Sequence, residues 1–384
     1  MFPFDFQCPT RIVFGPGKLH ELGALAAGLT AKRVLVVSDR GIVTAGHTSR
    51  GIHSLEQHGC EVTLFDRIDE NPTTAHVDDG LATAKDFRPD LIVGIGGGSS
   101  MDCAKGINFL CSCGGRMHDY WGEGKATGPL MPMIAVPTTA GTGSETQSFA
   151  LIADAATHVK MACGDKRAAF RAAILDPELT LTQPPRVTAL TGIDAIAHAL
   201  ESYVTKRRNS LSLVFSREAW RHLAPNLPRV IEDPNDLVAR GAMQLGACLA
   251  GLAIENSMLG AAHALANPLT ANYGIAHGQA IAAMLPHVIR RNGQRVEAWY
   301  RELISCTDGK LLASSNGYAA GALAAFVAEL AHAGGLSGKL SECSVPREEL
   351  PELAEAATEQ WTAQFNPVEL QKTDFLELYE AAYD

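Results

Sequence analysis

Short apolar runs alternate with helical patterns along the first half of the chain, and this alternation stops near residue 183. Runs such as RVLVVS and DLIVGI are rich in β-branched residues, and each precedes a stretch with helical spacing of its apolar residues. Such alternation predicts βαβ units and a mostly parallel sheet. Beyond QPPR, residues 183–186, the patterns are long and helical, without a convincing strand. A chain of 384 residues is too long for one compact hydrophobic core. We therefore expect an α/β domain over residues 1–184 and an all-helical domain over residues 185–384.

The charge and the apolar segments narrow the class of function. A net charge of −10 and a pI near 5.7 provide no basic stripe for binding nucleic-acid phosphates. The N-terminal residues have neither the basic start nor the continuous apolar stretch of a signal peptide. Residues 242–266 are long and apolar, but Glu255 and Asn256 at their middle predict buried core rather than a membrane span. We expect a cytoplasmic enzyme that acts on a small molecule, with no nucleic-acid and no membrane partner.

Two glycine-containing loops follow apolar runs of the first half. In DLIVGIGGGSSMDCAK the run reaches Gly96, Gly97 and Gly98, and Ser99 or Ser100 can cap the helix that follows. Glycine lets a backbone approach a ligand closely, and free N–H groups at a helix start attract phosphate, so a dinucleotide fits. The spacing is neither GxGxxG nor a P-loop, and a tight strand-to-helix turn is the alternative. The second loop, in MIAVPTTAGTGSE, weakens that alternative with the hydroxyl donors Thr138, Thr139, Thr142 and Ser144.

Histidines and one aspartate gather in the second half. Asp194 and His198 are four residues apart in GIDAIAHALES, so both side chains leave the same face of a helix. The segment HALANPLTANYGIAHG adds His263 and His277. Three neutral imidazoles and a carboxylate suit a divalent transition metal such as iron or zinc. Hydrogen-bonded core histidines are the alternative for either cluster alone, but a buried, unpaired Asp194 would be costly and a cation removes that cost.

Together these motifs resemble a known family. GGGSSMDCAK, PTTAGTGSE, GIDAIAHALE and HALANPLTANYGIAHG, in this order and at these separations, resemble the iron-containing (group III) alcohol dehydrogenases. The resemblance covers nearly the whole chain, from RIVFGPGKL to the helical second half. It implies an N-terminal α/β domain that holds a nicotinamide dinucleotide, a helical domain that holds the metal, and a cleft between them. It also implies hydride transfer between a primary alcohol, or its aldehyde, and NAD.

The resemblance also assigns residues to the metal and the cofactor. The implied metal ligands are Asp194, His198, His263 and His277. We favour Fe²⁺ over Zn²⁺, because four protein ligands and a substrate oxygen exceed the coordination usual for catalytic zinc. The implied cofactor contacts are Asn71, Gly97, Gly98, Ser99, Asp102, Thr138, Thr139, Thr142, Lys160 and Leu179. A solvated surface charge explains Lys160 equally well, and a core position explains Leu179.

Two more residues bear on the cofactor and the substrate. Asp39 follows RVLVVS, where a carboxylate can bind the adenosine ribose and repel a 2′-phosphate, so we expect NAD rather than NADP. A turn aspartate is the alternative, and the neighbouring Arg40 could bind a phosphate. Asn267 stands where many similar enzymes have the second histidine of HxxxH, so we expect it to orient the substrate without titrating. Its alternative role is a helix cap before Pro268.

Other functions on the same scaffold stay open from the sequence. A sugar-phosphate lyase of the dehydroquinate synthase type would need basic residues around a phosphate, and residues 192–205 contain none. A glycerol-type dehydrogenase is a second alternative, and a non-catalytic metal- or nucleotide-binding protein is the least favoured. Because similar enzymes are often dimers or larger, we expect a homo-oligomer.

Overall fold

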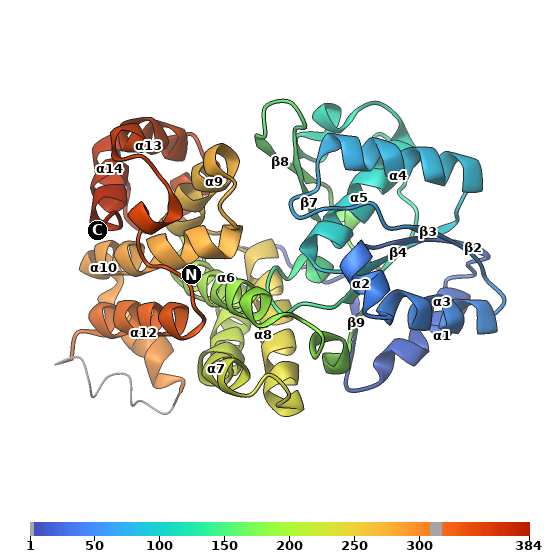
Figure 1. The fold of residues 1–384 in the computed structure, drawn as a ribbon, viewed down its shortest axis with the longest axis horizontal. Helices are drawn as coiled ribbons and strands as arrows, with labels where there is room; N and C mark the ends of the chain where they lie inside the picture. The colour runs from blue at the N-terminus through green and yellow to red at the C-terminus, as the bar shows by residue number, and fades with distance from the viewer. Residues whose placement is uncertain (1–3, 308–316) are drawn as a thin grey trace. The chain divides into compact units, whose positions relative to one another are not determined.

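The chain folds into two compact units, which are described one at a time (Figure 1). The computed structural model describes residues 4–307 and 317–384. The first unit spans Gln7–Gln183. The second spans Pro184–Asp384 and includes the described residues that precede Gln7. The glycine loops lie in the first unit, and the histidine clusters lie in the second.

The first unit is built on a six-stranded sheet in which every strand pair is parallel. Its strands are β1 (Arg11–Phe14), β2 (Arg33–Val37), β3 (Glu61–Phe65), β4 (Leu91–Gly96), β6 (Met133–Pro137) and β9 (Ala172–Leu175). Their order across the sheet is β1-β9-β6-β4-β2-β3. The predicted mostly parallel α/β fold is therefore confirmed.

The direction of strand addition reverses beside β2. The strand β3 pairs with one edge of β2, whereas β4 pairs with its other edge and the later strands continue on that side. In parallel α/β sheets the loops diverge at such a point and leave a crevice at the carboxyl ends of the strands, where ligands bind. Asp39 follows β2 and Gly97 follows β4, so both lie at this crevice.

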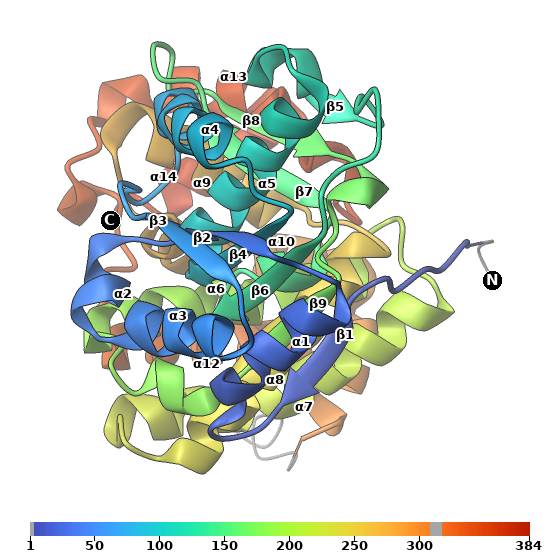
Figure 2. The same ribbon diagram turned by 90° about the vertical axis from the view of Figure 1, so that its right-hand side faces the viewer.

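Helices cover both faces of the large sheet. They are α1 (Leu22–Gly28), α2 (Arg40–Thr44), α3 (His47–Gln57), α4 (Thr74–Phe87) and α5 (Gly98–Cys113). Figure 2 shows α4 and α5 on one face and α1 and α3 on the other. Along β2 the side chains alternate, because Leu35 packs with the first pair of helices and Val36 with the second. Burial on both faces explains why this strand is a continuous apolar run.

A second sheet, which the sequence did not predict, completes the first unit. It has three strands, β5 (Gly122–Glu123), β7 (Phe149–Ala153) and β8 (Lys160–Gly164), in the order β5-β8-β7. β7 and β8 form an antiparallel pair. Both runs are short and contain alanine or glycine, so they lack the β-branched signal that marked the large sheet. Short 3₁₀ helices of this unit are η1 (Lys18–Glu21), η2 (Met117–Tyr120), η3 (Ser144–Thr146), η4 (Lys166–Ala168) and η5 (Pro177–Thr180).

The second unit is helical, and the described residues from 184 onward contain no strand, as predicted. Its helices are α6 (Pro185–Val204), α7 (Ser210–Glu232), α8 (Leu237–Glu255), α9 (Ala261–Tyr273), α10 (His277–Ser305), α12 (Ala319–Ala333), α13 (Leu350–Thr358) and α14 (Lys372–Ala381). Its 3₁₀ helices are η6 (Ser341–Cys343), η7 (Arg347–Glu349) and η8 (Ala363–Phe365).

One described helix, α8, is long and apolar enough to cross a membrane by length and composition alone. Its best window has a mean hydropathy of 1.6, and 72% of that window is buried inside the structure, in agreement with the predicted buried core. The apolar segment 242–266 is not one helix, because α8 ends at Glu255 and α9 begins at Ala261. This break places His263 in the first turn of α9.

Candidate metal centre and dinucleotide site

The motif GIDAIAHALES forms the middle of α6, which is buried along most of its length. Asp194 is 5% exposed and His198 is 6% exposed. The Nε2 atom of His198 lies 3.3 Å from Oδ1 of Asp194, one helical turn away. The two side chains therefore share a face of α6, as the four-residue spacing predicts.

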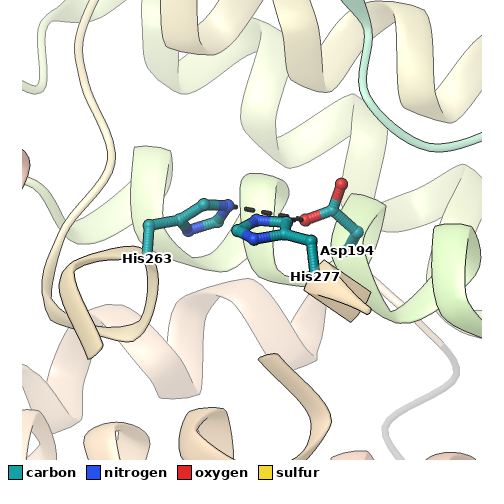
Figure 3. A group of neighbouring side chains, drawn as sticks. All are labelled: Asp194, His263 and His277. Atoms are coloured by element: carbon teal, nitrogen blue, oxygen red, sulfur yellow. Dashed lines mark ion pairs between the residues drawn. The ribbon is translucent and has the colours of Figure 1, made fainter. Parts of the chain in front are cut away.

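His263 on α9 and His277 on α10 bring two more imidazoles to the same carboxylate oxygen (Figure 3). Their Nε2 atoms lie 3.5 Å and 3.6 Å from Oδ1 of Asp194, respectively. Ligand atoms of Asp194, His263 and His277 all lie within 4.8 Å of one another. With His198, three Nε2 atoms converge on one carboxylate oxygen, so the structure brings together all four predicted ligands.

The electrostatics of this cluster favour a positive charge at its centre. Burial by itself would raise the pKa of Asp194, but the surrounding histidines, His198 most strongly, hold it below its usual range. Burial by itself would lower the pKa of His263, yet the carboxylates of Asp194 and Glu201 raise it to about 9. In the part of the chain that the structure describes, Asp194 Oδ1 and His263 Nε2 have no hydrogen-bond partner. Burying such polar atoms without a partner destabilises the fold unless a shared proton or a bound metal cation lies between them.

Asp194, His263 and His277 form a group that could hold a divalent transition metal, and His198 lies 3.3 Å from the same carboxylate oxygen. Three imidazole nitrogens and one carboxylate oxygen are ligands that iron and zinc both accept. Two ligand atoms that each lie about 2.1 Å from such an ion are about 3.4 Å apart at a tetrahedral angle. The distances from Asp194 Oδ1 to the three Nε2 atoms, 3.3, 3.5 and 3.6 Å, are close to that value.

The two glycine loops pack against each other at the carboxyl ends of β4 and β6. The N–H of Thr138 donates to the carbonyl of Gly96 over 2.9 Å. Gly96 has φ 155, in the region that favours glycine. A Cβ atom on Gly98 would lie 2.6 Å from Cγ2 of Thr142, closer than side-chain carbons approach. Glycine is therefore required at position 96 because of its backbone angle, and at position 98 because a side chain there would overlap Thr142.

The start of α5 differs from the predicted one. The helix begins at Gly98 without a side-chain cap, so the predicted cap by Ser99 or Ser100 is wrong. Both serines lie inside the first turn, because the helix begins two residues earlier than a cap at Ser99 predicts and three earlier than a cap at Ser100 predicts. Ser99 Oγ accepts from the N–H of Asn71 over 3.3 Å, and Ser100 Oγ donates to Asp39 Oδ2 over 3.4 Å. Uncapped N–H groups at the start of a 16-residue helix suit a phosphate.

Four other predicted cofactor residues have different surroundings in the structure. Lys160 Nζ donates to Asn71 Oδ1 over 3.2 Å, so these two residues lie beside Ser99 and the glycine loop. The hydroxyl of Thr138 is buried and, within residues 4–307 and 317–384, has no hydrogen-bond partner. Leu179 is fully buried and packs in the hydrophobic core. The core interpretation therefore accounts for its side chain.

Sequence and structure comparisons then decide the family. The family described as iron-containing alcohol dehydrogenase matches residues 9–177, and the C-terminal part of the Fe-containing alcohol dehydrogenase family matches residues 188–383. The chain belongs to the iron-containing alcohol dehydrogenases. It is therefore an oxidoreductase that acts on alcohols.

Individual relatives of this alcohol dehydrogenase match at moderate identity. A 1,3-propanediol dehydrogenase of Klebsiella pneumoniae is 32% identical over 382 residues, which cover 99% of both chains. An NAD-dependent methanol dehydrogenase of Bacillus methanolicus is 35% identical over 288 residues, covering 75% of this chain and 76% of the relative. The solved structure of a 1,3-propanediol oxidoreductase covers 100% of both chains with a TM-score of 0.95 at 33% identity. These matches favour the oxidoreductase over the lyase and the non-catalytic alternatives.

Asp102, a predicted cofactor contact, forms hydrogen bonds within the protein that connect α5 to the second loop. Asp102 accepts from Ser144 Oγ over 2.6 Å and from the N–H of Leu151 over 3.2 Å. Lys105, which is fully buried, donates to Ser144 Oγ over 2.8 Å and lies 3.5 Å from Asp102. Sequence reasoning did not single out Lys105. This network joins α5 to the loop that follows β6, so it fixes the shape of the crevice.

Asn267 lies one turn beyond His263 on α9 of the alcohol dehydrogenase. Its side-chain N–H donates to Oε1 of Gln360 over 3.0 Å. The interpretation of Asn267 as a helix cap is wrong, because α9 continues through Pro268 to Tyr273. Pro268 has no N–H to donate, so the helix passes it at the cost of one backbone hydrogen bond. Asn267 is thus an interior helix residue on the same side of α9 as His263.

Sequence reasoning missed one residue beside the candidate metal centre. Glu201 is 3% exposed, and its Oε2 forms a 2.6 Å hydrogen bond with Nδ1 of His263. Its other oxygen accepts from the N–H of Ala262 over 2.7 Å. Glu201 belongs to the motif GIDAIAHALES, seven residues after Asp194 and three after His198. Helical spacing could have revealed it, since positions three and seven apart share a face.

Proposed function

We propose that the protein catalyses the NAD-dependent oxidation of a primary alcohol to its aldehyde, and the reverse reduction, with Fe²⁺ in the cluster of Asp194, His198, His263 and His277. The observation that carries this proposal is the convergence of three Nε2 atoms on the buried Oδ1 of Asp194. When bound there, a divalent cation would act as a Lewis acid towards the hydroxyl of an alcohol. Zn²⁺ is the alternative occupant.

Asn267 would orient the substrate but would not accept the proton of its hydroxyl group. Asn267 lies one turn beyond His263, and an amide can donate and accept hydrogen bonds but does not titrate. Its N–H is directed to Gln360, which holds the amide in one orientation. We propose that Asn267 contributes orientation and that the substrate proton leaves through water or another residue.

NAD is the proposed hydride acceptor. The uncapped start of α5, the hydroxyl of Thr138 and the crevice at β2 and β4 support a dinucleotide site. The name of the methanol dehydrogenase relative, which states NAD dependence, supports this choice of cofactor. Asp39 supports NAD over NADP, because its carboxylate lies beside the glycine loop and would repel a 2′-phosphate. The cytoplasmic location and the homo-oligomer stay predictions.

A substrate screen tests this function. The full-length, Fe²⁺-loaded protein would be given short primary alcohols, diols and acid-bearing aldehydes, with the absorbance of NADH as the signal. Glycerol, the substrate type of the alternative dehydrogenase, is the comparison compound. We expect NAD-dependent oxidation of at least one primary alcohol. Turnover of none of them by a protein that holds its metal and binds NAD would contradict the proposal.

A further inference from the structure

The carboxylate of Glu201 contacts the ring nitrogen of His263 that does not face Asp194. Its Oε2 lies 2.6 Å from His263 Nδ1, and the residue is 3% exposed. An ionised carboxylate can only accept hydrogen bonds, so Nδ1 must carry the proton of the imidazole. The lone pair of a neutral His263 is then on Nε2, which lies 3.5 Å from Oδ1 of Asp194. This is the tautomer that a metal ligand requires at that atom.

The start of α9 is built around the same carboxylate. Ala262 lies in the first turn, where its N–H has no intrahelical partner, and Oε1 of Glu201 accepts it over 2.7 Å. Gly260 precedes the helix, and a Cβ atom at that position would lie 3.1 Å from Oε1 of Glu201. Glycine therefore leaves room for the carboxylate. Glu201 thus fixes both the ring of His263 and the backbone turn that carries it.

We propose that Glu201 is a positioning residue that selects the Nδ1-protonated tautomer of His263, orients its Nε2 towards Asp194 and thereby raises the affinity of the centre for its metal. The inference rests on the proposed function, since it assumes a metal in this cluster. Glu201 would act through His263 and not as a metal ligand itself. Partners of metal-bound histidines change metal affinity about 10- to 100-fold when they are removed.

The substitution Glu201→Gln tests the inference with little change of shape. If the amide oxygen keeps its bond to the N–H of Ala262, the amide nitrogen faces Nδ1 of His263. A donor at that place favours the tautomer with the proton on Nε2, which cannot bind a cation through that atom. The metal-free, full-length protein would be titrated with Fe²⁺ without oxygen, and with Zn²⁺ as a second probe. We expect about 10- to 100-fold weaker binding of both ions by the variant.

Asn366→Ala is the matched control. Asn366 Oδ1 also accepts from the first turn of α9, at the N–H of Ala261 over 3.3 Å, but its described hydrogen bonds do not include His263. This variant should lower the melting temperature while changing the metal affinity less than about threefold. A loss of affinity as large as that of Glu201→Gln would assign the effect to the fold of α9 and overturn the inference.

The unmodified protein supplies a test that does not depend on the folding of a variant. NMR of nitrogen-labelled histidine side chains in the Zn²⁺-loaded protein should show His263 protonated at Nδ1 only. A proton on Nε2 would overturn the inference, as would equal metal affinities of the original protein and Glu201→Gln. Failure of the original protein to bind either ion would instead contradict the proposed function, so the two failures are distinguishable.

Discussion

The candidate metal centre is built from side chains, whereas the candidate dinucleotide site at the glycine loops is built mainly from backbone. At the centre, imidazoles from three helices converge on Asp194, and two of the buried polar atoms there have no hydrogen-bond partner among the described residues. At the loops, α5 begins at Gly98 without a side-chain cap, and the side chains of Asp102 and Lys105 form hydrogen bonds with Ser144 of the second loop. A metal site is thus defined by residue type, and a phosphate site by backbone conformation.

This difference predicts that substitutions at the two sites fail in different ways. Loss of a ligand at the centre should abolish the site without moving the backbone around it. Loss of space at the loops should weaken cofactor binding while the metal remains bound. The following substitutions test that contrast, from the largest expected effect to the smallest.

His263→Ala should remove the metal and lower kcat/KM by about a thousandfold or more, since a Lewis acid contributes several kcal/mol to the transition state. Metal content and turnover would be measured on the same sample. His222→Ala is the control, because His222 lies in the same unit 3.5 Å from Glu218 and outside the cluster. A His263→Ala variant that keeps its metal would show that this imidazole is not a ligand.

Gly98→Ala should weaken NAD binding about 5- to 150-fold, because overpacking against Thr142 costs about 1–3 kcal/mol. The metal content should stay unchanged, which separates the two sites. Gly28→Ala is the control, since a Cβ atom there would meet nothing within 4 Å. NAD affinity would be measured by fluorescence titration. Equal affinities of the two variants would show that the glycine loop does not approach the cofactor.

Asp39→Asn should shift the preference from NAD towards NADP by about tenfold, because it removes the charge that repels a 2′-phosphate. Asp39 also caps α2 by accepting from the N–H of Ile42. Asparagine keeps that cap, whereas Asp39→Gly loses the side-chain bond and serves as the comparison. The ratio of kcat/KM for the two dinucleotides is the measurement. A preference of the unsubstituted enzyme for NADP would contradict this role of Asp39.

Asn267→Ala should lower kcat/KM about 2- to 10-fold, the worth of one hydrogen bond, without removing a titration from the pH profile. Asn267→His should add a titration near the usual imidazole value of about 6.5. Gln360→Ala removes the partner of Asn267 and should give a smaller loss in the same direction. Unchanged kinetics in all three variants would leave Asn267 with a structural role only.

The side-chain site was the easier one to predict from sequence. Helical spacing alone puts Asp194 and His198 on one face, because the geometry of a helix is local. The contacts of Glu201 with His263 and of Asn267 with Gln360 join residues 62 and 93 positions apart. Such pairings depend on how helices pack, and a single sequence does not specify them.

The backbone site was predicted in outline only. The apolar runs revealed β4 and β6 and therefore the positions of both loops. The start of α5 lies two or three residues earlier than predicted, because Ser99 and Ser100 suggest a cap whereas Gly97 is the residue that precedes the helix. The β7 and β8 strands were missed because their alanines and glycine carry little strand signal.

Metal removal and reconstitution of the full-length protein test the central claim most directly. The protein would be stripped with a chelator, checked for metal content, and assayed with a primary alcohol and NAD before and after addition of Fe²⁺ or Zn²⁺. We predict that stripping abolishes turnover and that Fe²⁺ restores it better than Zn²⁺ at one ion per chain. Turnover at the original rate by the fully stripped protein would contradict the assignment of Asp194, His198, His263 and His277 as a catalytic metal centre.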